Sequence, residues 1–276
     1  MGTGIVLAGQ AALLAGLDIS NFLDDPKLRL SPKDLRLRNP HERAFVHLVV
    51  MHSTLGIPGG TDLRRQTILP GFGPPTNAGE RTVAMWASDP SRPAGAHLIV
   101  DFDGKIYCCA DLVTEAAYHA QLANGCSIGI EIVQGLKSAE MYTEQLAVAA
   151  DLATAICAAM PTPIQKQIPT PYLGHPIGRF VASQQTGVPL ADVVGIVGHR
   201  DLTATRGEGD PGNTIMEALA AQGCERFDFE NHTDIAVWKS RQTILGMANP
   251  DGIPGPMTVA ALKSSGRSDG FWKSTP

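Results

Sequence analysis

The stretch CSIGIEIVQGLKSAEMYTEQLAVAADLATAICAAM, residues 126–160, decides the fold class of this chain. Its first ten residues are mostly apolar, with one glutamate among them, and predict a buried strand. From Ser138 to Met160, apolar residues recur at helical spacing on one face, and Pro161 and Pro163 then end the pattern. A strand that leads into an amphipathic helix is the building unit of an α/β protein.

Strands and helices alternate along the rest of the chain as well. The expected segments are strands at residues 44–52 and 193–197, a hairpin at residues 95–112 that turns at Asp103-Gly104, and helices at residues 77–87 and 213–223. The helix at 77–87 begins with Asn77 and carries Glu80 three residues later, which is the spacing of a capping box. This interleaving predicts an α/β fold.

Composition and charge narrow the classes of function. Hydrophobic residues make up 43% of the 276, which is enough to bury a substantial core, and the net charge of −5 argues against nucleic-acid binding. The five cysteines are odd in number and form no CxxC motif. We therefore expect no disulfide framework and a reducing compartment of synthesis.

The N-terminal twenty residues contain an apolar run of small residues. The run lacks the positive start of a secretory signal, and it is too short and too rich in glycine to span a bilayer. We expect a docking helix or arm here, with a cryptic export signal as the alternative. The expected protein is made in the cytoplasm, has no membrane span and is monomeric.

Two histidines stand where apolar strands end, His52 and His199. Asp210 lies 11 residues after His199, too far for one helical face, so the loop between them must fold back to bring the two together. Two histidines and one carboxylate form an ordinary ligand set for catalytic zinc. The chain has eight histidines and many acids, however, so spacing alone leaves other combinations open.

Four sequence blocks occur in order and carry a resemblance to a known family. They are VVMHST (49–54), SRPAGAHLIVDFDGKIYCCADLVTEAAYHA (91–120), CSIGIEIVQG (126–135) and VGHRD…DPG (197–212). Together they resemble the zinc-dependent N-acetylmuramoyl-L-alanine amidases, the amidase-2 group related to peptidoglycan recognition proteins. The resemblance implies a mixed central β-sheet flanked by helices. It also implies cleavage of the amide between the lactyl group of N-acetylmuramic acid and L-alanine of the stem peptide.

The resemblance assigns Zn²⁺ to His52, His199 and Asp210, and the catalytic carboxylate to Glu131. Glu131 also interrupts an apolar strand, where a carboxylate is costly unless it has a partner. A solvent-facing glutamate on an edge strand is the alternative. The implied chemistry is metal-assisted hydrolysis, in which Glu131 takes a proton from the zinc-activated water and returns it to the leaving amine.

Further residues of the resembling blocks are expected to contact substrate or to support the site. His119 in AYHA resembles a Trp-His-Ala block that lines the family's groove, and His175 is expected at the substrate unless it is a solvent-exposed loop histidine. Relatives often place a Lys or Thr donor for the oxyanion two residues before the third ligand, where this chain has Glu208. We expect Arg206 to supply the positive charge instead and Glu208 to contact substrate, with an Arg206–Glu208 ion pair as the alternative.

Three parts are expected along the chain: an N-terminal arm at residues 1–43, an amidase-2-like catalytic domain at 44–224, and a small helical module at 233–270. The module resembles the peptidoglycan-binding module of cell-wall hydrolases, and a helical hairpin packed on the amidase is the alternative. The expected partners are peptidoglycan or muropeptides. The wall-binding resemblance favours a lysin that acts on the bacterial cell wall over a delivered effector or a recycling enzyme. A non-catalytic peptidoglycan-binding protein and a zinc peptidase that cuts another amide stay open as alternatives.

Overall fold

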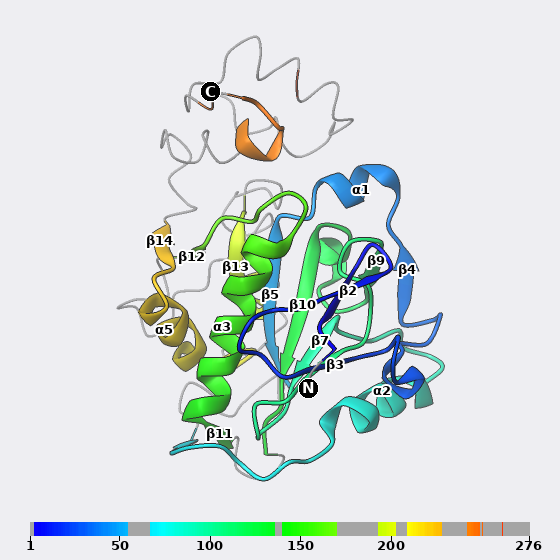
Figure 1. Ribbon diagram of the computed structural model, residues 1–276, viewed down its shortest axis with the longest axis vertical. Coiled ribbons are helices and arrows are strands. Elements are labelled where there is room, and N and C mark those ends of the chain that lie inside the picture. Colours follow the sequence, from blue (N-terminus) through cyan, green and yellow to red (C-terminus); the bar gives the residue numbers. More distant parts are fainter. Residues whose placement is uncertain are drawn as a thin grey trace.

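A central mixed sheet organises the molecule (Figure 1). The computed structural model describes residues 3–54, 67–135, 140–169, 193–202, 209–227, 242–248, 250 and 261. Within them, the six strands of this sheet lie in the order β13 (Gly195–Gly198), β5 (Leu48–Ser53), β10 (Ser127–Ile132), β7 (Leu98–Val100), β8 (Ile106–Cys108) and β3 (Ile19–Asn21). Strands β13, β5, β10 and β7 are parallel, β8 is antiparallel to β7, and β3 is parallel to β8. The predicted α/β class with a mixed central sheet is confirmed.

Successive side chains of the strands point to opposite faces of the sheet, so both faces are apolar and both are covered by helices. Ile128, Ile130 and Ile132 of β10 pack in one core with the apolar residues of α3 (Thr143–Ala159) and α5 (Asn213–Ala221). On the opposite face, residues of β5 pack against the turn η2 (Gln121–Cys126), and residues of β7 pack against α2 (Ala78–Ser88). The alternation therefore sends the neighbours of the isoleucines, including Glu131, to the face away from α3.

One predicted helix start is wrong, and at a second helix the start is correct but the predicted cap is not formed. Residues Glu140–Tyr142 form a strand, β11, that pairs with β6 (Thr67–Leu69), so α3 begins at Thr143 rather than Ser138. At α2, Asn77 has a left-handed backbone and makes no side-chain cap, so the expected capping box with Glu80 is not formed. The carboxylate of Asp101 accepts the hydrogen bond of the Ala78 N–H at 3.1 Å instead.

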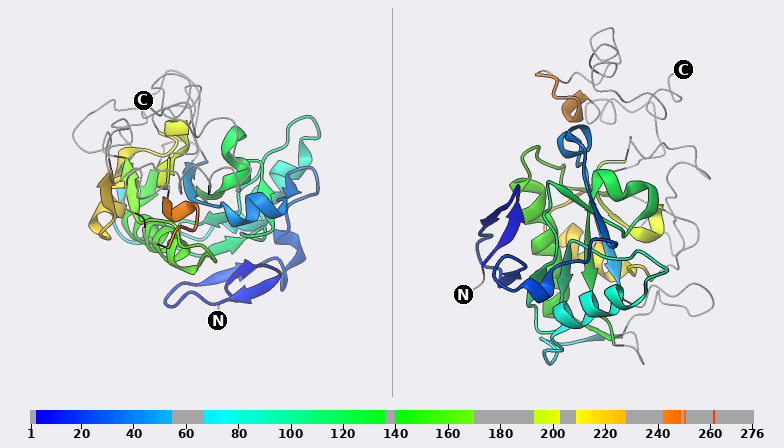
Figure 2. Two further views of the ribbon diagram at one scale, coloured as in Figure 1. Left: turned by 90° about the horizontal axis from the view of Figure 1, so that it is seen from above. Right: turned by 90° about the vertical axis from the view of Figure 1, so that its right-hand side faces the viewer.

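The first 43 residues supply structure around the sheet as well as its edge strand, β3. They contain the hairpin of β1 (Ile5–Leu7) and β2 (Gln10–Ala12), the turn η1 (Pro26–Leu28), β4 (Leu35–Leu37) and the start of α1 (Pro40–Ala44). The hairpin lies on the same side of the sheet as α3, and residues of β1 belong to the core that α3 covers (Figures 1 and 2). Strand β4 pairs with β9 (Glu115–Ala117).

The remaining described segments lie outside the six-stranded sheet. Strand β12 (Gln167–Pro169) pairs with β14 (Glu225–Phe227). Of the predicted module at 233–270, the structure describes only residues 242–248, 250 and 261, and Ile244 there packs against the core that contains Leu48 and Val50. Among the described residues, no helix has the length and apolar character needed to cross a membrane.

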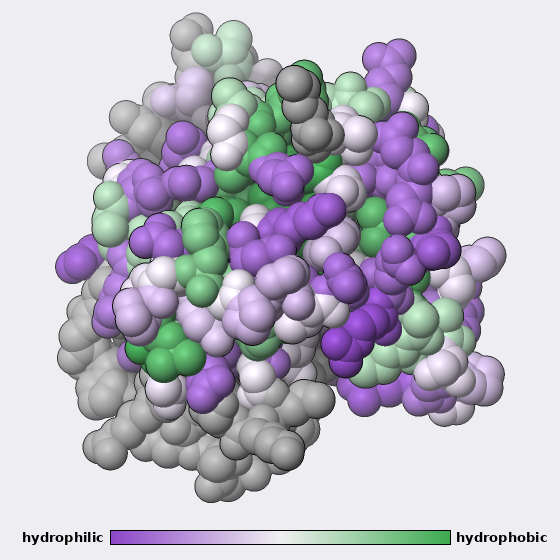
Figure 3. Space-filling view, turned by 60° about the horizontal axis from the view of Figure 1, so that its bottom comes forward, coloured by the Kyte–Doolittle hydropathy of each residue, from purple (hydrophilic) through white to green (hydrophobic). Residues whose placement is uncertain are grey.

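Strands β5 and β10 run from the top of Figure 1 to the bottom, so their carboxyl ends meet at the bottom edge of the sheet. Figure 3 turns this edge toward the viewer. Over its coloured part the surface is mainly hydrophilic, and the hydrophobic residues form smaller groups between the hydrophilic ones. The carboxyl edge is where parallel α/β sheets bring side chains from separate strands together.

Candidate metal centre

Three side chains that are far apart in the sequence meet at the carboxyl edge of the sheet. His52 is the next-to-last residue of β5. His199 is the first residue of the short helix α4 (His199–Leu202), which follows β13. Asp210 lies in the loop between α4 and α5. All three are buried, and one ligand atom from each lies within 4.8 Å of the others. The His199 Nδ1 is 3.1 Å from Asp210 Oδ2, and the His52 Nδ1 is 3.7 Å from Asp210 Oδ1.

Backbone and side-chain hydrogen bonds fold the loop back, as the spacing from His199 to Asp210 requires. The Arg200 N–H donates to the Asp210 carbonyl at 2.9 Å. From β5, the Ser53 N–H donates to Asp210 Oδ1 at 3.1 Å, and the Ser53 hydroxyl donates to the Gly209 carbonyl at 2.7 Å. The end of β5 therefore positions both His52 and the carboxylate.

The three residues fit a metal ion. Both ring nitrogens of His199 are buried and make no hydrogen bond among the residues that the structure describes, although Nδ1 lies close to the carboxylate of Asp210. Buried polar atoms are satisfied in the great majority of cases, so nitrogens left without a hydrogen bond beside a carboxylate indicate a missing ligand. Imidazole and carboxylate together are donors that zinc accepts in catalytic sites. The group could therefore hold a metal.

Glu131 lies next to this group in the sheet. In the parallel pairing of β10 with β5, Glu131 is the register partner of His52. Neighbouring strands are about 4.8 Å apart and register partners point to the same face, so the carboxylate and the imidazole project side by side, away from α3. Glu131 is half-buried, whereas the flanking Ile130 and Ile132 are fully buried. A carboxylate thus lies beside the group of His52, His199 and Asp210, called the metal group below.

His119 contacts a proposed ligand directly. Its Nδ1 lies 2.9 Å from His52 Nε2, and its Nε2 lies 3.1 Å from the Ser127 hydroxyl oxygen. The residue is partly exposed, yet burial of the ring lowers its pKa well below the usual value. Burial therefore favours the neutral imidazole, and both of its ring nitrogens have partners within the protein.

Sequence reasoning missed Ser127 and Gly129, which both lie against the His119 ring. A Cβ at Gly129 would come within 2.7 Å of the His119 ring, so only glycine leaves room for the imidazole. Ser127, Gly129 and Glu131 alternate along β10 with fully buried isoleucines. This alternation of small or polar residues with isoleucine was the signal for a face of β10 that turns toward a site.

Arg200 and Asp201 hold the segment that carries His199. The Asp201 carboxylate accepts the Gly198 N–H at 2.7 Å, and burial raises the pKa of this carboxyl well above its usual range. An Arg200 Nη donates to the Asn213 side-chain oxygen at 2.7 Å, which ties α4 to the start of α5. The predicted roles of Arg206, Glu208 and His175 lie outside the described residues.

The sequence model of the Amidase_2 family, described as N-acetylmuramoyl-L-alanine amidase, matches residues 42–213. The chain belongs to this family. The matched range covers more than half of the chain and includes His52, Glu131, His199 and Asp210. The predicted family resemblance is confirmed.

Two solved structures are similar to this Amidase_2 chain. Drosophila peptidoglycan recognition protein SD is 14% identical, with 77% of this chain and 99% of that chain covered and a TM-score of 0.43. A selenomethionine derivative of AmpD is 19% identical, with 75% and 96% covered and a TM-score of 0.40. No curated protein sequence matches the chain significantly.

Proposed function

We propose that this chain is a zinc-dependent hydrolase of the amide between the lactyl group of N-acetylmuramic acid and L-alanine of peptidoglycan stem peptides. The observation that carries the proposal is the buried His52–His199–Asp210 group, with the ring nitrogens of His199 lacking hydrogen bonds, in a chain of the Amidase_2 family. Two histidines and one carboxylate leave further coordination positions for water and substrate.

In this proposal His52, His199 and Asp210 hold the zinc ion. The chemistry that zinc supplies at such a site is Lewis-acid activation of water and of the scissile carbonyl. The Glu131 carboxylate stands beside His52, accepts a proton from the attacking water and delivers it to the departing amine of L-alanine. The positive charge for the oxyanion is assigned to Arg206 from its place in the sequence between His199 and Asp210.

The test uses purified full-length protein and isolated peptidoglycan. Protein treated with EDTA is divided, one half is restored with zinc, and both are incubated with peptidoglycan before released fragments are identified by mass spectrometry. Free stem peptides that begin with L-alanine are expected from the zinc-restored half alone. Cleavage inside the stem peptide would favour a zinc peptidase, and binding without any cleavage would favour a recognition protein.

A role on the intact cell wall, as in a lysin, is a second part of the proposal. It is supported by the resemblance of residues 233–270 to a peptidoglycan-binding module. We expect the full-length protein to sediment with pelleted sacculi and to release stem peptides from them. A protein that does not bind or cleave sacculi but cleaves soluble muropeptides would contradict the role on the cell wall. It would still support the proposed amide hydrolysis.

A further inference from the structure

A chain of hydrogen bonds connects the start of β10 to the metal group. The Ser127 hydroxyl donates to the Ala123 carbonyl at 2.6 Å. The Ser127 oxygen lies 3.1 Å from His119 Nε2, and His119 Nδ1 lies 2.9 Å from His52 Nε2. The other ring nitrogen of His52, Nδ1, is the one that faces Asp210.

Counting protons along this chain fixes the direction of each hydrogen bond. The Ala123 carbonyl can only accept, so it takes the one hydroxyl proton of Ser127. The Ser127 oxygen must then accept from His119, which places the His119 proton on Nε2. A neutral imidazole carries one N–H, so His119 Nδ1 accepts and His52 Nε2 donates. The Nδ1 of His52 therefore carries no proton.

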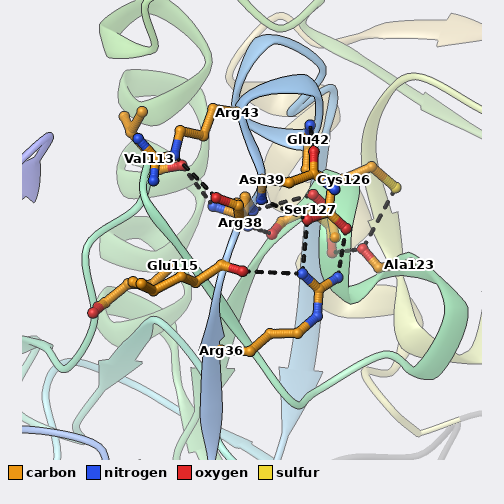
Figure 4. Close-up of polar contacts among 12 residues, drawn as sticks. Arg36, Arg38, Asn39, Glu42, Arg43, Val113, Glu115, Ala123, Cys126 and Ser127 are labelled. Carbon is orange, nitrogen blue, oxygen red and sulfur yellow. Dashed lines mark hydrogen bonds and ion pairs between the residues drawn. The ribbon is translucent and has the colours of Figure 1, made fainter. Parts of the chain in front are cut away.

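Two further residues, Arg38 and Asn124, hold the backbone around Ser127 and His119. Arg38, which is fully buried, donates to the backbone carbonyl of Ser127 (Figure 4). It also donates to the carbonyl of Gly125 at 3.1 Å. The Asn124 side-chain oxygen accepts the backbone N–H of His119 at 3.0 Å. The backbone that carries the Ser127 hydroxyl and the His119 imidazole is thus held by residues outside the His52–His199–Asp210 group.

We propose that Ser127 and His119 are positioning residues that keep His52 protonated on Nε2, so that its Nδ1 is always presented to zinc beside Asp210. This inference rests on the zinc site of the proposed function. A hydrogen bond to the second nitrogen of a ligand histidine commonly sets which nitrogen binds the metal, and loss of such a partner typically weakens metal affinity by about 10- to 100-fold. The inference adds a relay of two residues to the three ligands.

The test compares Ser127→Ala, His119→Leu and His119→Asn with the unaltered full-length protein. Asn is the conservative replacement, because its side-chain oxygen can still accept the His52 proton. Cys126→Ala is the matched control, since its thiol also donates to the Ala123 carbonyl but has no contact with His119 in the described hydrogen bonds. Zinc affinity is measured by competition with a chelator. The tautomer of His52 is read from ¹⁵N chemical shifts in the metal-free protein.

We expect zinc affinity about 10- to 100-fold weaker in Ser127→Ala and His119→Leu, partial recovery in His119→Asn, and no change in Cys126→Ala. The ¹⁵N shifts should show His52 protonated on Nε2 in the unaltered protein and a mixture of tautomers in Ser127→Ala. Unchanged affinity and an unchanged tautomer in both Ser127→Ala and His119→Leu would overturn the relay.

The two readouts separate this inference from the proposed function. A protein that binds zinc and shows the predicted shifts but releases no stem peptide would contradict the reaction and support the relay. A protein that binds no zinc would contradict the zinc site, and the metal-free tautomer of His52 alone would then decide whether Ser127 and His119 set the protonation. His52 protonated on Nδ1 in the unaltered protein would overturn the relay in every case.

Discussion

Two buried polar clusters lie at opposite ends of the central strands, and they differ in how their polar atoms are satisfied. At the amino end of β10, the Arg38 guanidinium donates to the carbonyls of Leu112, Gly125 and Ser127. At the carboxyl end of β5, His199 is equally buried, yet neither of its ring nitrogens makes a hydrogen bond. Within the described part of the chain, the Arg38 guanidinium has its hydrogen-bond partners and the His199 ring does not.

The difference indicates which cluster is built for stability and which for a ligand. A buried charge is tolerated where its donors are satisfied, and burial lowers the pKa of Arg38 only to about 10, so it stays charged at neutral pH. A buried group without partners costs stability unless something outside the chain satisfies it. The four predictions that follow test this contrast.

The largest expected effect is on catalysis at the carboxyl end. Replacing Glu131 with Gln removes the proposed general base, and we expect stem-peptide release to fall about 10²- to 10⁴-fold. Zinc content and thermal midpoint should stay near those of the unaltered protein, because Glu131 is outside the ligand group. Mass spectrometry of released peptides and metal analysis measure the two quantities. Release at the unaltered rate would remove Glu131 from the mechanism.

The next effect is on stability at the amino end. Replacing Arg38 with Met leaves several buried carbonyls without a donor, at about 1–3 kcal/mol each, so we expect a loss of roughly 3–5 kcal/mol in the free energy of unfolding. Urea unfolding of the zinc-free protein measures it.

The matched variant for Arg38 is His199→Ala. In zinc-free protein it breaks no hydrogen bond of the His199 ring, so its loss of stability should be smaller than that of Arg38→Met. Added zinc should raise the unfolding midpoint of the unaltered protein but not that of His199→Ala, because only the intact group binds the ion. Equal losses in the two variants would break the contrast between the clusters.

Much of this arrangement could be predicted from local pattern. The apolar runs that end at His52 and His199 are strands that lie side by side, and parallel strands bring their carboxyl ends to one edge. The alternation in β10 places Glu131 on the face of His52. Strand periodicity and the ordered family blocks were therefore enough to predict that His52, His199 and Asp210 lie together and that Glu131 lies beside His52.

What the sequence could not show depends on partners that are remote along the chain. Helix α3 starts late because Glu140–Tyr142 pair with Thr67–Leu69, some seventy residues earlier. Asp101, not Glu80, caps α2, because the hairpin turn brings its carboxylate to the helix start. No periodicity encodes such contacts, and the same holds for the hydrogen bond between Ser127 and His119 across the turn η2.

A third prediction concerns His97, which lies between the two clusters and is fully buried. Its Nδ1 accepts the Gly129 N–H at 3.0 Å, and burial lowers its pKa to about 3. An unfolded histidine has a pKa of about 6.5. The unfolded state therefore binds more protons below that pH, and stability falls as the pH drops toward 3, by about 1.4 kcal/mol per pH unit.

Urea unfolding between pH 7 and pH 4 tests this sign. His97→Gln cannot bind the proton, so the variant should lose less stability on acidification than the unaltered protein, even if it is less stable at pH 7. Identical slopes for the two proteins would show that His97 is not buried as a neutral base.

The smallest expected effect links the clusters through Gly129. A Cβ there would come within 2.7 Å of the His119 ring, so Gly129→Ala must displace the imidazole, and overpacking of this kind costs about 1–3 kcal/mol. A displaced His119 ring would lose its hydrogen bond to His52 Nε2, so zinc affinity should fall as well. The control is Ile130→Val on the opposite face of β10, which should cost about 0.5–1.5 kcal/mol and leave zinc affinity unchanged. Lost stability without a change in zinc affinity in Gly129→Ala would show that the ring serves packing alone.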